Sequence, residues 1–531
     1  MPQNNIDVLI VGAGPVGLFC ANELTRHGLA CRIIDKKNSI SDKSKALGIH
    51  IRTLDVLEDC GFIDEFLKQG QKIIGALFKS KGKTLINANF ACIEADRHFL
   101  IDLPQNQTED ILYKSLQSKG IQVEWETELT HLNQSPNDIT ATLQKPKNKI
   151  ELLSANWLIA CDGAHSTVRH QVDAEFIGSS YKQSWWLADL LVDWKVTEKQ
   201  MALYISDKGP LACFPMGNKR YRIVMTAPKG STGDPSLDNI DSEFKKRSSD
   251  LANLSNPIWL TEFSIHHRQI QKYKYDRVFF AGDAAHIHSP MGGQGLNTGI
   301  QDIYNLVWKL ALVEKRKAKP DLLDTYHEER FPVGQAVLKK TDAMTRMILL
   351  KNPVAIAIRN AFIQFMTSFK LVRNKILSDL AELNISYSQS SIVHQLGSVK
   401  HLKAGEYLPD FQLMNNATQN SVNRNTITQG ILHDLFIFSG NNSKKTPELI
   451  NLANTLAKQF PDSIQVHLVL EQQSENINEP VIKIWFDKQL QVQQRFGIKK
   501  PTLLLVRPDK YIGMLQNPIN KDKLIKELYL L

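Results

Sequence analysis

The sequence predicts an α/β protein, in which a nucleotide-binding domain with a parallel sheet is interrupted by an antiparallel sheet and followed by a second α/β domain. Three observations support this fold class: a glycine-rich turn between a strand and a helix near the N-terminus, alternating apolar segments in the middle of the chain, and a polar stretch between Ser386 and Asn425. A chain of 531 residues is expected to divide into about three domains.

The glycine-rich turn lies in IDVLIVGAGPVGLFCANELTRHGLACRIIDKK, residues 6–37. A β-branched run predicts the first strand, helical periodicity follows the turn, and a second apolar run predicts the next strand. In the motif G-x-G-x-x-G, the first glycine allows a tight turn, the second lets the backbone approach a pyrophosphate, and the third lets the helix pack against the sheet. The pattern predicts a Rossmann-like dinucleotide site at Gly12, Gly14, Pro15, Val16 and Gly17, with a coincidental glycine turn as the alternative.

Asp35 ends the second predicted strand, where its carboxylate can accept hydrogen bonds from an adenosine ribose. The next residue, Lys36, is also expected beside the nucleotide. A 2′-phosphate would be repelled by the carboxylate of Asp35, so this site suits FAD or NAD better than NADP.

Two further strand ends carry carboxylates. NWLIACDGAHSTVRH, residues 156–170, ends a strand at Asp162 and places Arg169 at the start of a helix. VFFAGDAAHIHSPMGGQGLNTGIQD, residues 278–302, ends a strand at Asp283 and enters a helix through a glycine-rich loop. Carboxylates and free backbone N–H groups at such ends suit a ribose and a pyrophosphate. Each segment alone is also compatible with an ordinary strand-turn-helix connection.

The order of these three motifs resembles that of the FAD-dependent aromatic hydroxylases, the single-component flavoprotein monooxygenases that include phenol and chlorophenol hydroxylases. The resemblance continues through KALGIHIRTLDVLEDCG (45–61), LPQNQTEDIL (103–112), NLVWKLALV (305–313) and LLDTYHEERFPV (322–333). It implies FAD as the cofactor and NADPH or NADH as co-substrate. It also implies hydroxylation of a phenolic or other electron-rich aromatic compound by O₂, through a flavin C4a-hydroperoxide.

The resemblance also implies a set of cofactor contacts. It places the adenosine ribose at Asp35 and the pyrophosphate at Gly14, Pro15 and Asp283. The other contacts that it implies are Lys45, Gln105, Leu129, Asp162, Arg169, Gly282, Pro290, Gly292, Gly293, Gly295, Leu296 and Asn297. At Lys45 most relatives have an arginine, so the charge is kept but the bidentate geometry is lost.

Residues 176–269 are predicted as a substrate-binding β-sheet domain, inserted into an FAD-binding domain that comprises residues 1–175 and 270–390. QSWWLADLLVDWKV, MALYISDKGPLACFPMG and RYRIVMTA alternate as strands of an antiparallel sheet do. Neighbouring Trp185 and Trp186 must face opposite sides of a regular strand, so at most one can face a cavity. The candidates for the substrate pocket are Phe214, Pro215 and Met216, and core packing is the alternative for each.

No catalytic acid or base is assigned from the sequence. The resemblance places an arginine of the 220–227 strand against the flavin, which makes Arg222 a candidate for stabilising negative charge there. A plain surface pairing is the alternative for this arginine. His266 and His267 could act as a base, but a structural role is favoured, because a base must lie within hydrogen-bond reach of the substrate. No metal site is expected, since neither histidines nor cysteines show ligand spacing.

Residues 391–531 are predicted to form a thioredoxin-like α/β domain, because strand-helix-strand is followed by strand-strand-helix. All six cysteines precede this domain, which therefore has no dithiol chemistry. Packing or dimerisation is its expected role, and a homodimer is left open.

The composition is that of an ordinary globular protein, with 42% hydrophobic and 22% charged residues. The net charge of +9 is read as a lysine-rich solvated surface, with steering of anionic substrates as the alternative, and no nucleic-acid motif is found. Free cysteines without C-x-x-C spacing predict a reducing compartment, hence the cytoplasm. Charges and a proline interrupt the apolar stretch 347–372, so we predict a packed or interface helix, no integral membrane segment, and peripheral membrane contact as the minor alternative.

Two other functions remain open at this stage. The first is a flavin-dependent epoxidase or another oxygenase on the same fold, and the second is a non-catalytic flavin-binding interaction protein. The sequence does not identify the aromatic substrate.

Overall fold

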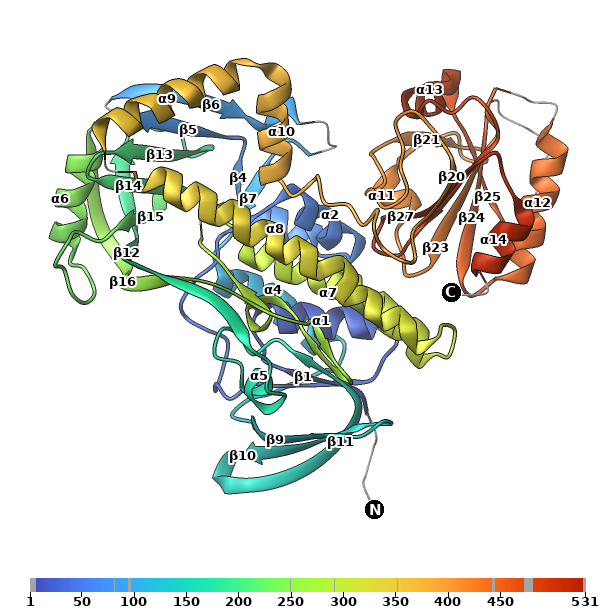
Figure 1. Ribbon diagram of the computed structural model, residues 1–531, viewed down its shortest axis with the longest axis horizontal. Coiled ribbons are helices and arrows are strands. Elements are labelled where there is room, and N and C mark those ends of the chain that lie inside the picture. The colour runs from blue at the N-terminus through green and yellow to red at the C-terminus, as the bar shows by residue number, and fades with distance from the viewer. Residues whose placement is uncertain are drawn as a thin grey trace.

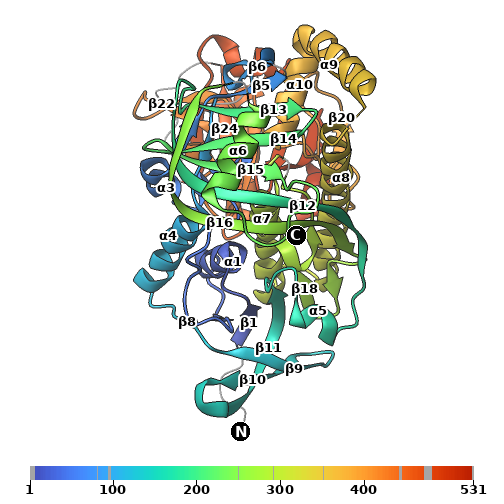
Figure 2. The same cartoon turned by 90° about the vertical axis from the view of Figure 1, so that its left-hand side faces the viewer.

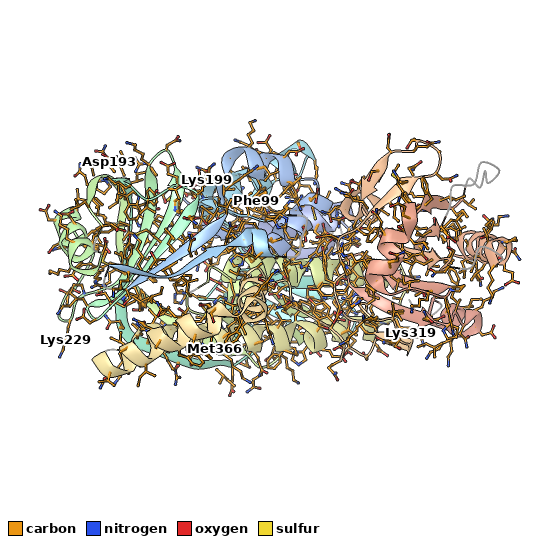
Figure 3. All side chains as sticks on the ribbon, turned by 90° about the horizontal axis from the view of Figure 1, so that it is seen from above. Phe99, Asp193, Lys199, Lys229, Lys319 and Met366 are labelled. Carbon is orange, nitrogen blue, oxygen red and sulfur yellow. The ribbon has the colours of Figure 1, made fainter. Side chains whose placement is uncertain are left out.

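The computed structural model describes residues 6–80, 82–93, 97–248, 250–290, 292–350, 352–441, 445–471 and 481–528. Three large sheets and one small sheet organise these residues. The nucleotide-binding sheet lies at the bottom of Figure 1, the middle sheet at the upper left and the C-terminal sheet at the right. Seen from above, Asp193 and Lys229 mark the outer end of the middle sheet, opposite the C-terminal domain (Figure 3).

The nucleotide-binding sheet has the strand order β17-β18-β11-β1-β2-β8. Its parallel strands are β1 (Ile6–Val11), β2 (Cys31–Ile34), β8 (Val123–Glu124), β11 (Lys149–Ala160) and β18 (Val278–Phe280), with β17 (Lys274–Tyr275) antiparallel at the edge. β9 (Glu128–Gln134) and β10 (Ile139–Lys145) form an antiparallel extension from β11. The helices of this domain include α1 (Pro15–Arg26), α4 (Gln105–Ser118), α5 (Thr167–Gln171) and α7 (Gly295–Glu314).

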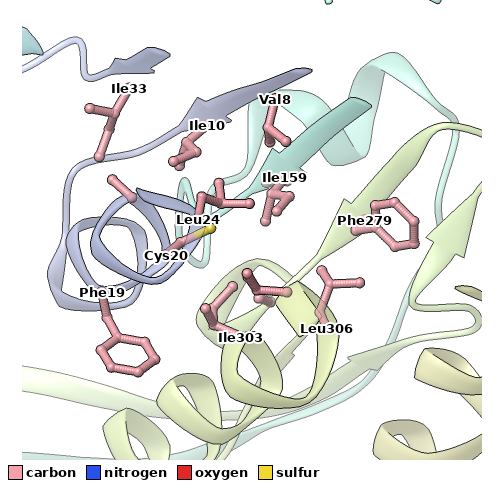
Figure 4. Packing of buried hydrophobic residues seen from close by; sticks show 14 of the residues in the cluster. Val8, Ile10, Phe19, Cys20, Leu24, Ile33, Ile159, Phe279, Ile303 and Leu306 are labelled. Carbon is pink, nitrogen blue, oxygen red and sulfur yellow. The ribbon is translucent and has the colours of Figure 1, made fainter. Parts of the chain in front are cut away.

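The core of this domain lies where α1 and α7 pack together beneath the sheet (Figure 4). Apolar side chains of the strands, the two helices and β18 are fully or almost fully buried there, among them Val8, Ile10, Cys20, Leu24, Ile159, Phe279, Ile303 and Leu306. The two helices approach closely because Gly299 has no side chain. A Cβ at this position would lie 2.6 Å from Val16 Cγ2.

The middle sheet has the strand order β19-β16-β12-β15-β14-β13-β5-β6. Its long strands β12 (Phe176–Trp194) and β16 (Ala252–Ile270) run up from the nucleotide-binding domain (Figure 2). β13 (Gln200–Ser206), β14 (Gly209–Gly217) and β15 (Arg220–Thr226) complete the antiparallel part, and α6 (Leu237–Arg247) packs against it. The antiparallel sheet predicted from the alternating segments is therefore confirmed. Trp185 and Trp186 belong to different buried clusters, as their adjacency predicts.

The predicted boundaries of this domain were wrong in one respect. β5 (Gly75–Ser80) and β6 (Lys83–Asn89) lie within the segment assigned to the FAD-binding domain, yet they extend the middle sheet, because β5 pairs in parallel with β13. β19 (His286–Ile287) likewise pairs with β16 at the other edge. An open strand edge recruits whatever backbone lies beside it, and sequence alternation does not reveal which segment that is.

A small sheet connects the two domains. It comprises β3 (Gly48–Ile49), β7 (Leu100–Asp102) and β4 (Gln71–Ile73), with β7 in the centre. The short helices α2 (Ile51–Asp59) and α3 (Ile63–Gln69) separate β3 from β4 along the chain.

Three helices follow α7 across the molecule: α8 (Asp324–Ile348), α9 (Pro353–Ser368) and α10 (Lys370–Leu380). α8 runs diagonally past α7, whereas α9 lies over β6 and contacts α10 (Figure 1). Among the helices that the structure describes, none is both long enough and apolar enough to cross a membrane.

The C-terminal sheet has the strand order β20-β27-β26-β23-β24-β25-β21-β22. β23 (His433–Phe438), α12 (Thr446–Gln459) and β24 (Ile464–Leu470) form a parallel unit, and the antiparallel strands β26 (Thr502–Val506) and β27 (Ile512–Asn517) lead to α14 (Lys521–Leu528). The remaining strands are β20 (His394–Gly397), β21 (Gln412–Asn415), β22 (Ser421–Asn423) and β25 (Lys483–Phe486), and the short helices are α11 (Arg424–Ile427) and α13 (Gln491–Phe496). The strand-helix-strand and strand-strand-helix order agrees with the expectation, and the thioredoxin-like classification stays a prediction.

A buried ionic group joins the C-terminal domain to the nucleotide-binding domain. Glu329 of α8 accepts two hydrogen bonds from Arg507, at 2.6 and 2.9 Å, and one from Lys309 of α7 at 2.7 Å. Burial raises the pKa of Glu329, but Arg507 and Lys309 lower it more, so the carboxyl stays ionised well below its usual range. Burial lowers the pKa of Lys309 to about 8. The ionisation of Glu329, Arg507 and Lys309 is therefore mutually dependent.

We expect Glu329→Gln to lower the free energy of unfolding by about 3–5 kcal/mol, because it leaves two buried cations without their shared anion. Denaturant unfolding, followed by circular dichroism, measures this change. The matched control is Glu328→Gln. Glu328 is an exposed neighbour of Glu329, and among the described residues it accepts hydrogen bonds from the backbone and the hydroxyl of Ser391. Equal losses from both variants would contradict the assigned role of the buried group.

Candidate functional site

The first glycine-rich turn combines two crowded glycines with an open one. Gly12 has φ +106°, and a Cβ there would lie 2.4 Å from the carbonyl oxygen of Cys161. A Cβ on Gly17 would lie 1.8 Å from the carbonyl oxygen of Gly12, whereas a Cβ on Gly14 would meet no described atom within 4 Å. No side chain caps the N-terminus of α1. This open helix end, with Pro15 at its first position, fits a pyrophosphate held by backbone N–H groups.

Asp35 is part of the same turn. Its Oδ2 accepts a hydrogen bond of 2.7 Å from the backbone of Ala13, and its Oδ1 accepts one of 2.9 Å from the backbone of Lys37. The carboxylate therefore sets the shape of the glycine loop, which sequence reasoning did not foresee. Lys36 is exposed beside it. Contact of Asp35 with a ribose stays a prediction.

Arg169 connects the second strand end to the third. It donates hydrogen bonds to the carbonyl oxygens of Ala164 (2.8 Å) and Ala284 (3.3 Å). Asp162 Oδ2 accepts from the backbone N–H of Val168 at 3.1 Å, while its buried Oδ1 has no hydrogen-bond partner among the described residues. Burial raises the pKa of Asp162. The two loops thus meet at one edge of the sheet, as predicted.

The third strand end turns Asp283 toward open space. Gly282 has φ +57°, and Asp283 is exposed although residues 278–282 and 284–286 are buried. The buried surroundings of Asp283 raise its pKa, and the positive charge of the exposed Lys45 opposes this shift. A polar, open position inside an otherwise buried turn suits a cofactor group that would cover it.

Asp302 of α7 holds this turn from behind. Its Oδ2 accepts hydrogen bonds from the backbone of Gly282 (3.1 Å) and from His286 (2.8 Å), and its Oδ1 accepts one from Arg330 (2.8 Å). Although burial raises the pKa of Asp302, Arg330 and His286 lower it more, so the group remains an anion. Sequence reasoning missed Asp302, whose signal is an acid in the first half of the largely apolar helix α7.

The loop that enters α7 contacts the segment around residues 44–50. Asn297 donates hydrogen bonds to the carbonyl oxygens of Gly48 (2.9 Å) and Gly293 (2.7 Å) and accepts one from the backbone of His50 (2.9 Å). Pro290 and Gly293 are exposed, while Leu296 is buried. Positive φ angles at Gly292 and Gly293, of 90° and 64°, explain why glycine is needed there. Gly295 begins the helix.

Gln105 holds the same 44–50 segment from the other side. Its side-chain oxygen accepts a hydrogen bond of 2.9 Å from the backbone of Ala46, and its amide donates one of 2.8 Å to Glu109. Gln105 and Asn297, 192 positions apart by their residue numbers, therefore contact one short segment. The family resemblance implies that both residues lie near the flavin ring, and the structure brings both to this segment; the flavin contact itself stays a prediction.

Arg222 lies on β15 and also reaches this segment. Its guanidinium donates two hydrogen bonds to Asp189, at 2.8 and 2.7 Å, and others to the carbonyl oxygens of Ser44 (2.6 Å) and Lys45 (2.8 Å). It is 3% exposed. Because its donors are already in use, Arg222 is a positioning residue that fastens the middle sheet to the loop. The expected role in stabilising charge on the flavin is not supported by these contacts.

Phe214 lies opposite Arg222 in the register of β14 and β15. Strand alternation places Phe214, which is half-buried, and Pro215, which is buried, on opposite faces. Met216 is half-buried and lies at a β-bulge between Pro215 and Gly217, where alternation is interrupted. Pro215 therefore does not share a wall with Phe214, whereas the predicted pocket contains both. Leu129 is 1% exposed and its side chain belongs to the core, which leaves only its backbone for a cofactor contact.

Asp102 is a buried carboxyl that sequence reasoning did not select. In β7 it shares a face with Leu100, whose apolar cluster also includes the half-buried Phe214. It is 1% exposed, and neither oxygen has a hydrogen-bond partner within the ranges that the structure describes. Burial raises the pKa of Asp102 to about 8, against the lowering effect of Arg222. The signal in the sequence is an acid within the apolar run before Pro104.

The raised pKa of Asp102 predicts a pH dependence. The unfolded chain releases this proton near pH 4 and the folded chain near pH 8, so the free energy of unfolding should fall across that window, by at most about 1.4 kcal/mol per pH unit. We expect Asp102→Asn to reduce this fall. Thermal unfolding at several pH values measures it.

Two features make this test specific. Glu382, whose pKa burial also raises to about 8, preserves a residual slope in the variant. The control Asp193→Asn changes an exposed acid and should leave the wild-type slope intact. An Asp102→Asn protein with that same slope would refute the prediction.

The glycine turn supports a second prediction, which separates ligand binding from folding. Gly14→Ala adds a Cβ in open space, so we expect unchanged stability without FAD but at least a tenfold loss of FAD affinity, measured by flavin fluorescence. Gly17→Ala forces a contact with the Gly12 backbone and should lower both. Full FAD affinity in Gly14→Ala would show that no cofactor approaches this loop.

Residues 5–341 match the family described as FAD binding domain. The 6-methylpretetramide 4-monooxygenase of Streptomyces rimosus is 33% identical over 404 residues, which cover 73% of this chain and 71% of that protein. The pentachlorophenol 4-monooxygenase of Sphingobium chlorophenolicum is 35% identical over 350 residues, or 64% and 65% of the two chains. A solved structure, the anhydrotetracycline hydroxylase OxyS from Streptomyces rimosus, is similar with a TM-score of 0.76 and 25% identity over 99% of both chains.

Proposed function

The chain belongs to the FAD binding domain family of flavoprotein monooxygenases, and we propose that it hydroxylates a phenolic or other electron-rich aromatic compound with O₂ and NADH or NADPH. One observation supports the site most directly. Three separate strand ends, at Gly12–Gly17, Asp162 and Asp283, meet around open space at the carboxyl edge of a single parallel sheet. That edge is where α/β sheets bind dinucleotides.

When bound, FAD supplies the redox chemistry, accepting a hydride equivalent and activating O₂. The chain's own residues bind and orient. Backbone N–H groups around Gly14 and the start of α1 would hold the pyrophosphate beside Asp283, and Asp35 would accept hydrogen bonds from the adenosine ribose. The loop before α7 and the 44–50 segment, which Asn297 joins, hold the ring system.

The middle sheet would form the wall of the substrate cavity that lies opposite the flavin. Phe214 faces the side on which Arg222 reaches the 44–50 segment, so an aromatic substrate can lie between this face and the flavin. Apolar contact there excludes water and positions the ring that is hydroxylated. Asp102 keeps a proton near neutral pH behind the same face.

Three further properties are the cellular compartment, the oligomeric state and the choice of co-substrate. The six cysteines of the chain are free thiols, which supports the prediction of a reducing compartment such as the cytoplasm. A homodimer and the choice between NADH and NADPH stay predictions.

The central experiment measures flavin content and then oxygen uptake with NADPH or NADH across a panel of phenols of increasing size. We expect a yellow protein in which one or more aromatic compounds stimulate NAD(P)H oxidation, and a product that carries one oxygen atom from ¹⁸O₂. A protein that takes up no FAD would refute the proposal. Flavin binding without stimulation by any compound would favour an interaction protein, and an epoxide product would favour the epoxidase.

The substrate wall can be tested by a pair of neighbouring variants. We expect Phe214→Ala to raise the KM for the aromatic substrate about tenfold and to increase uncoupled NAD(P)H oxidation, with FAD affinity unchanged. Pro215→Ala faces the opposite side of β14 and should leave the KM near that of the wild type. The same change in KM from both variants would argue against the assigned face.

A further inference from the structure

α9 presents a continuous apolar face to solvent. The α9 face comprises Val354, Ile358, Phe362, Phe365 and Phe369, whose side chains are 67, 65, 60, 62 and 49% exposed. The first four recur every three or four residues on one side of α9, over a length of about 17 Å, and Phe369 follows directly at the end of the helix. Phe365 and Phe369 pack edge to face with ring centroids 5.1 Å apart. Large exposed apolar patches of this kind mark interaction surfaces.

The opposite side of α9 fixes the helix in this orientation. Arg359 is 6% exposed and donates a hydrogen bond of 3.0 Å to the carbonyl oxygen of Met347, at the end of α8. Asn360 donates one of 3.2 Å to the hydroxyl of Ser80 in β5. Arg359 and Asn360 thus anchor the inner side of α9, where Ile356 is also buried. Figures 1 and 3 show the helix on the outside of the molecule, with Met366 labelled in Figure 3.

The charged residues that flank the α9 face along the chain are all basic. Between residues 343 and 378 the sequence has no aspartate or glutamate, whereas its basic residues are Arg346, Lys351, Arg359, Lys370, Arg373 and Lys375. Of these, Arg346 pairs with Asp342 and Arg359 is buried. Lys370 and Lys375 are exposed in α10, directly after the apolar face. A second copy of the chain would oppose positive charge to positive charge. An anionic lipid surface offers both an apolar layer and the opposite charge.

We propose that the α9 face binds the surface of an anionic lipid bilayer, with its phenylalanines among the acyl chains and its lysines at the headgroups. The attachment is peripheral, since none of the described helices could cross a membrane. This inference goes beyond hydroxylation and does not depend on it, because no residue of the α9 face belongs to the flavin site.

The test is co-sedimentation of the FAD-loaded, full-length protein with vesicles. One set contains phosphatidylcholine alone, and the other contains phosphatidylcholine with about one third phosphatidylglycerol. We expect the wild type to sediment with the anionic vesicles only, and less so at high salt. The variant Phe362→Ser/Phe365→Ser should reduce the bound fraction at least fivefold, and Lys370→Glu/Lys375→Glu should reduce it similarly.

The control variant is Ile150→Ser/Leu152→Ser, which removes two other exposed apolar side chains (62 and 72% exposed) from β11 and should bind like the wild type. Flavin absorbance and thermal unfolding confirm that each variant is folded. Absence of binding to anionic vesicles, or equal binding by the phenylalanine variant, would overturn the proposal. Light scattering provides another decisive outcome, since a wild-type dimer that Phe362→Ser/Phe365→Ser dissociates would assign the face to a second copy instead.

Discussion

The buried carboxylate of Asp302 is the interaction on which the flavin site depends. It accepts hydrogen bonds from the Gly282 backbone, from His286 and from Arg330, and it is completely buried. Arg330 in turn donates to the hydroxyl of Tyr387, in the segment that leads to the C-terminal domain, and to the carbonyl oxygen of Thr298. A single anion thereby joins α7, α8 and the Gly282–Asp283 turn. Without it, three buried groups would lose their partner at once.

A second constraint connects the nucleotide-binding domain to the middle sheet. Residues 44–50 receive hydrogen bonds from, or donate them to, Gln105, Asn297 and Arg222, which come from three different parts of the chain. Asp189 keeps the Arg222 guanidinium in place. The position of the 44–50 segment therefore depends on both domains. A shift of the middle sheet would also shift this segment, which lies beside the proposed site of the flavin ring. The proposed substrate face at Phe214 belongs to the same sheet.

Charged residues occur in two different settings in this protein, as buried ion pairs between domains and as exposed positive charge beside α9. Ionic groups such as Glu329 with Arg507 and Lys309 are buried between domains, where each charge has a partner. In the 343–378 segment, by contrast, the exposed lysines Lys370 and Lys375 directly follow an exposed apolar face, and the segment has no acidic residue. Buried ion pairs join the domains, whereas exposed positive charge beside an apolar surface suits contact with an anionic surface.

The sequence by itself determined the fold class and a dinucleotide site, and its resemblance to the aromatic hydroxylases implied the cofactor and the reaction type. The dinucleotide site rests on local patterns, because glycines at Gly12, Gly14 and Gly17 and acids at strand ends have fixed positions relative to their own strand and helix. Alternation likewise predicted the antiparallel strands of the middle sheet and the opposite faces of Trp185 and Trp186. Only the tertiary structure decided which segments meet across long sequence separations. It joined β5 to β13, turned Pro215 away from Phe214, saturated Arg222 with Asp189 and backbone carbonyls, and buried Asp102 and Asp302. Pairing, burial and the resulting pKa of a group depend on partners that are far away in the chain, and no local pattern specifies them.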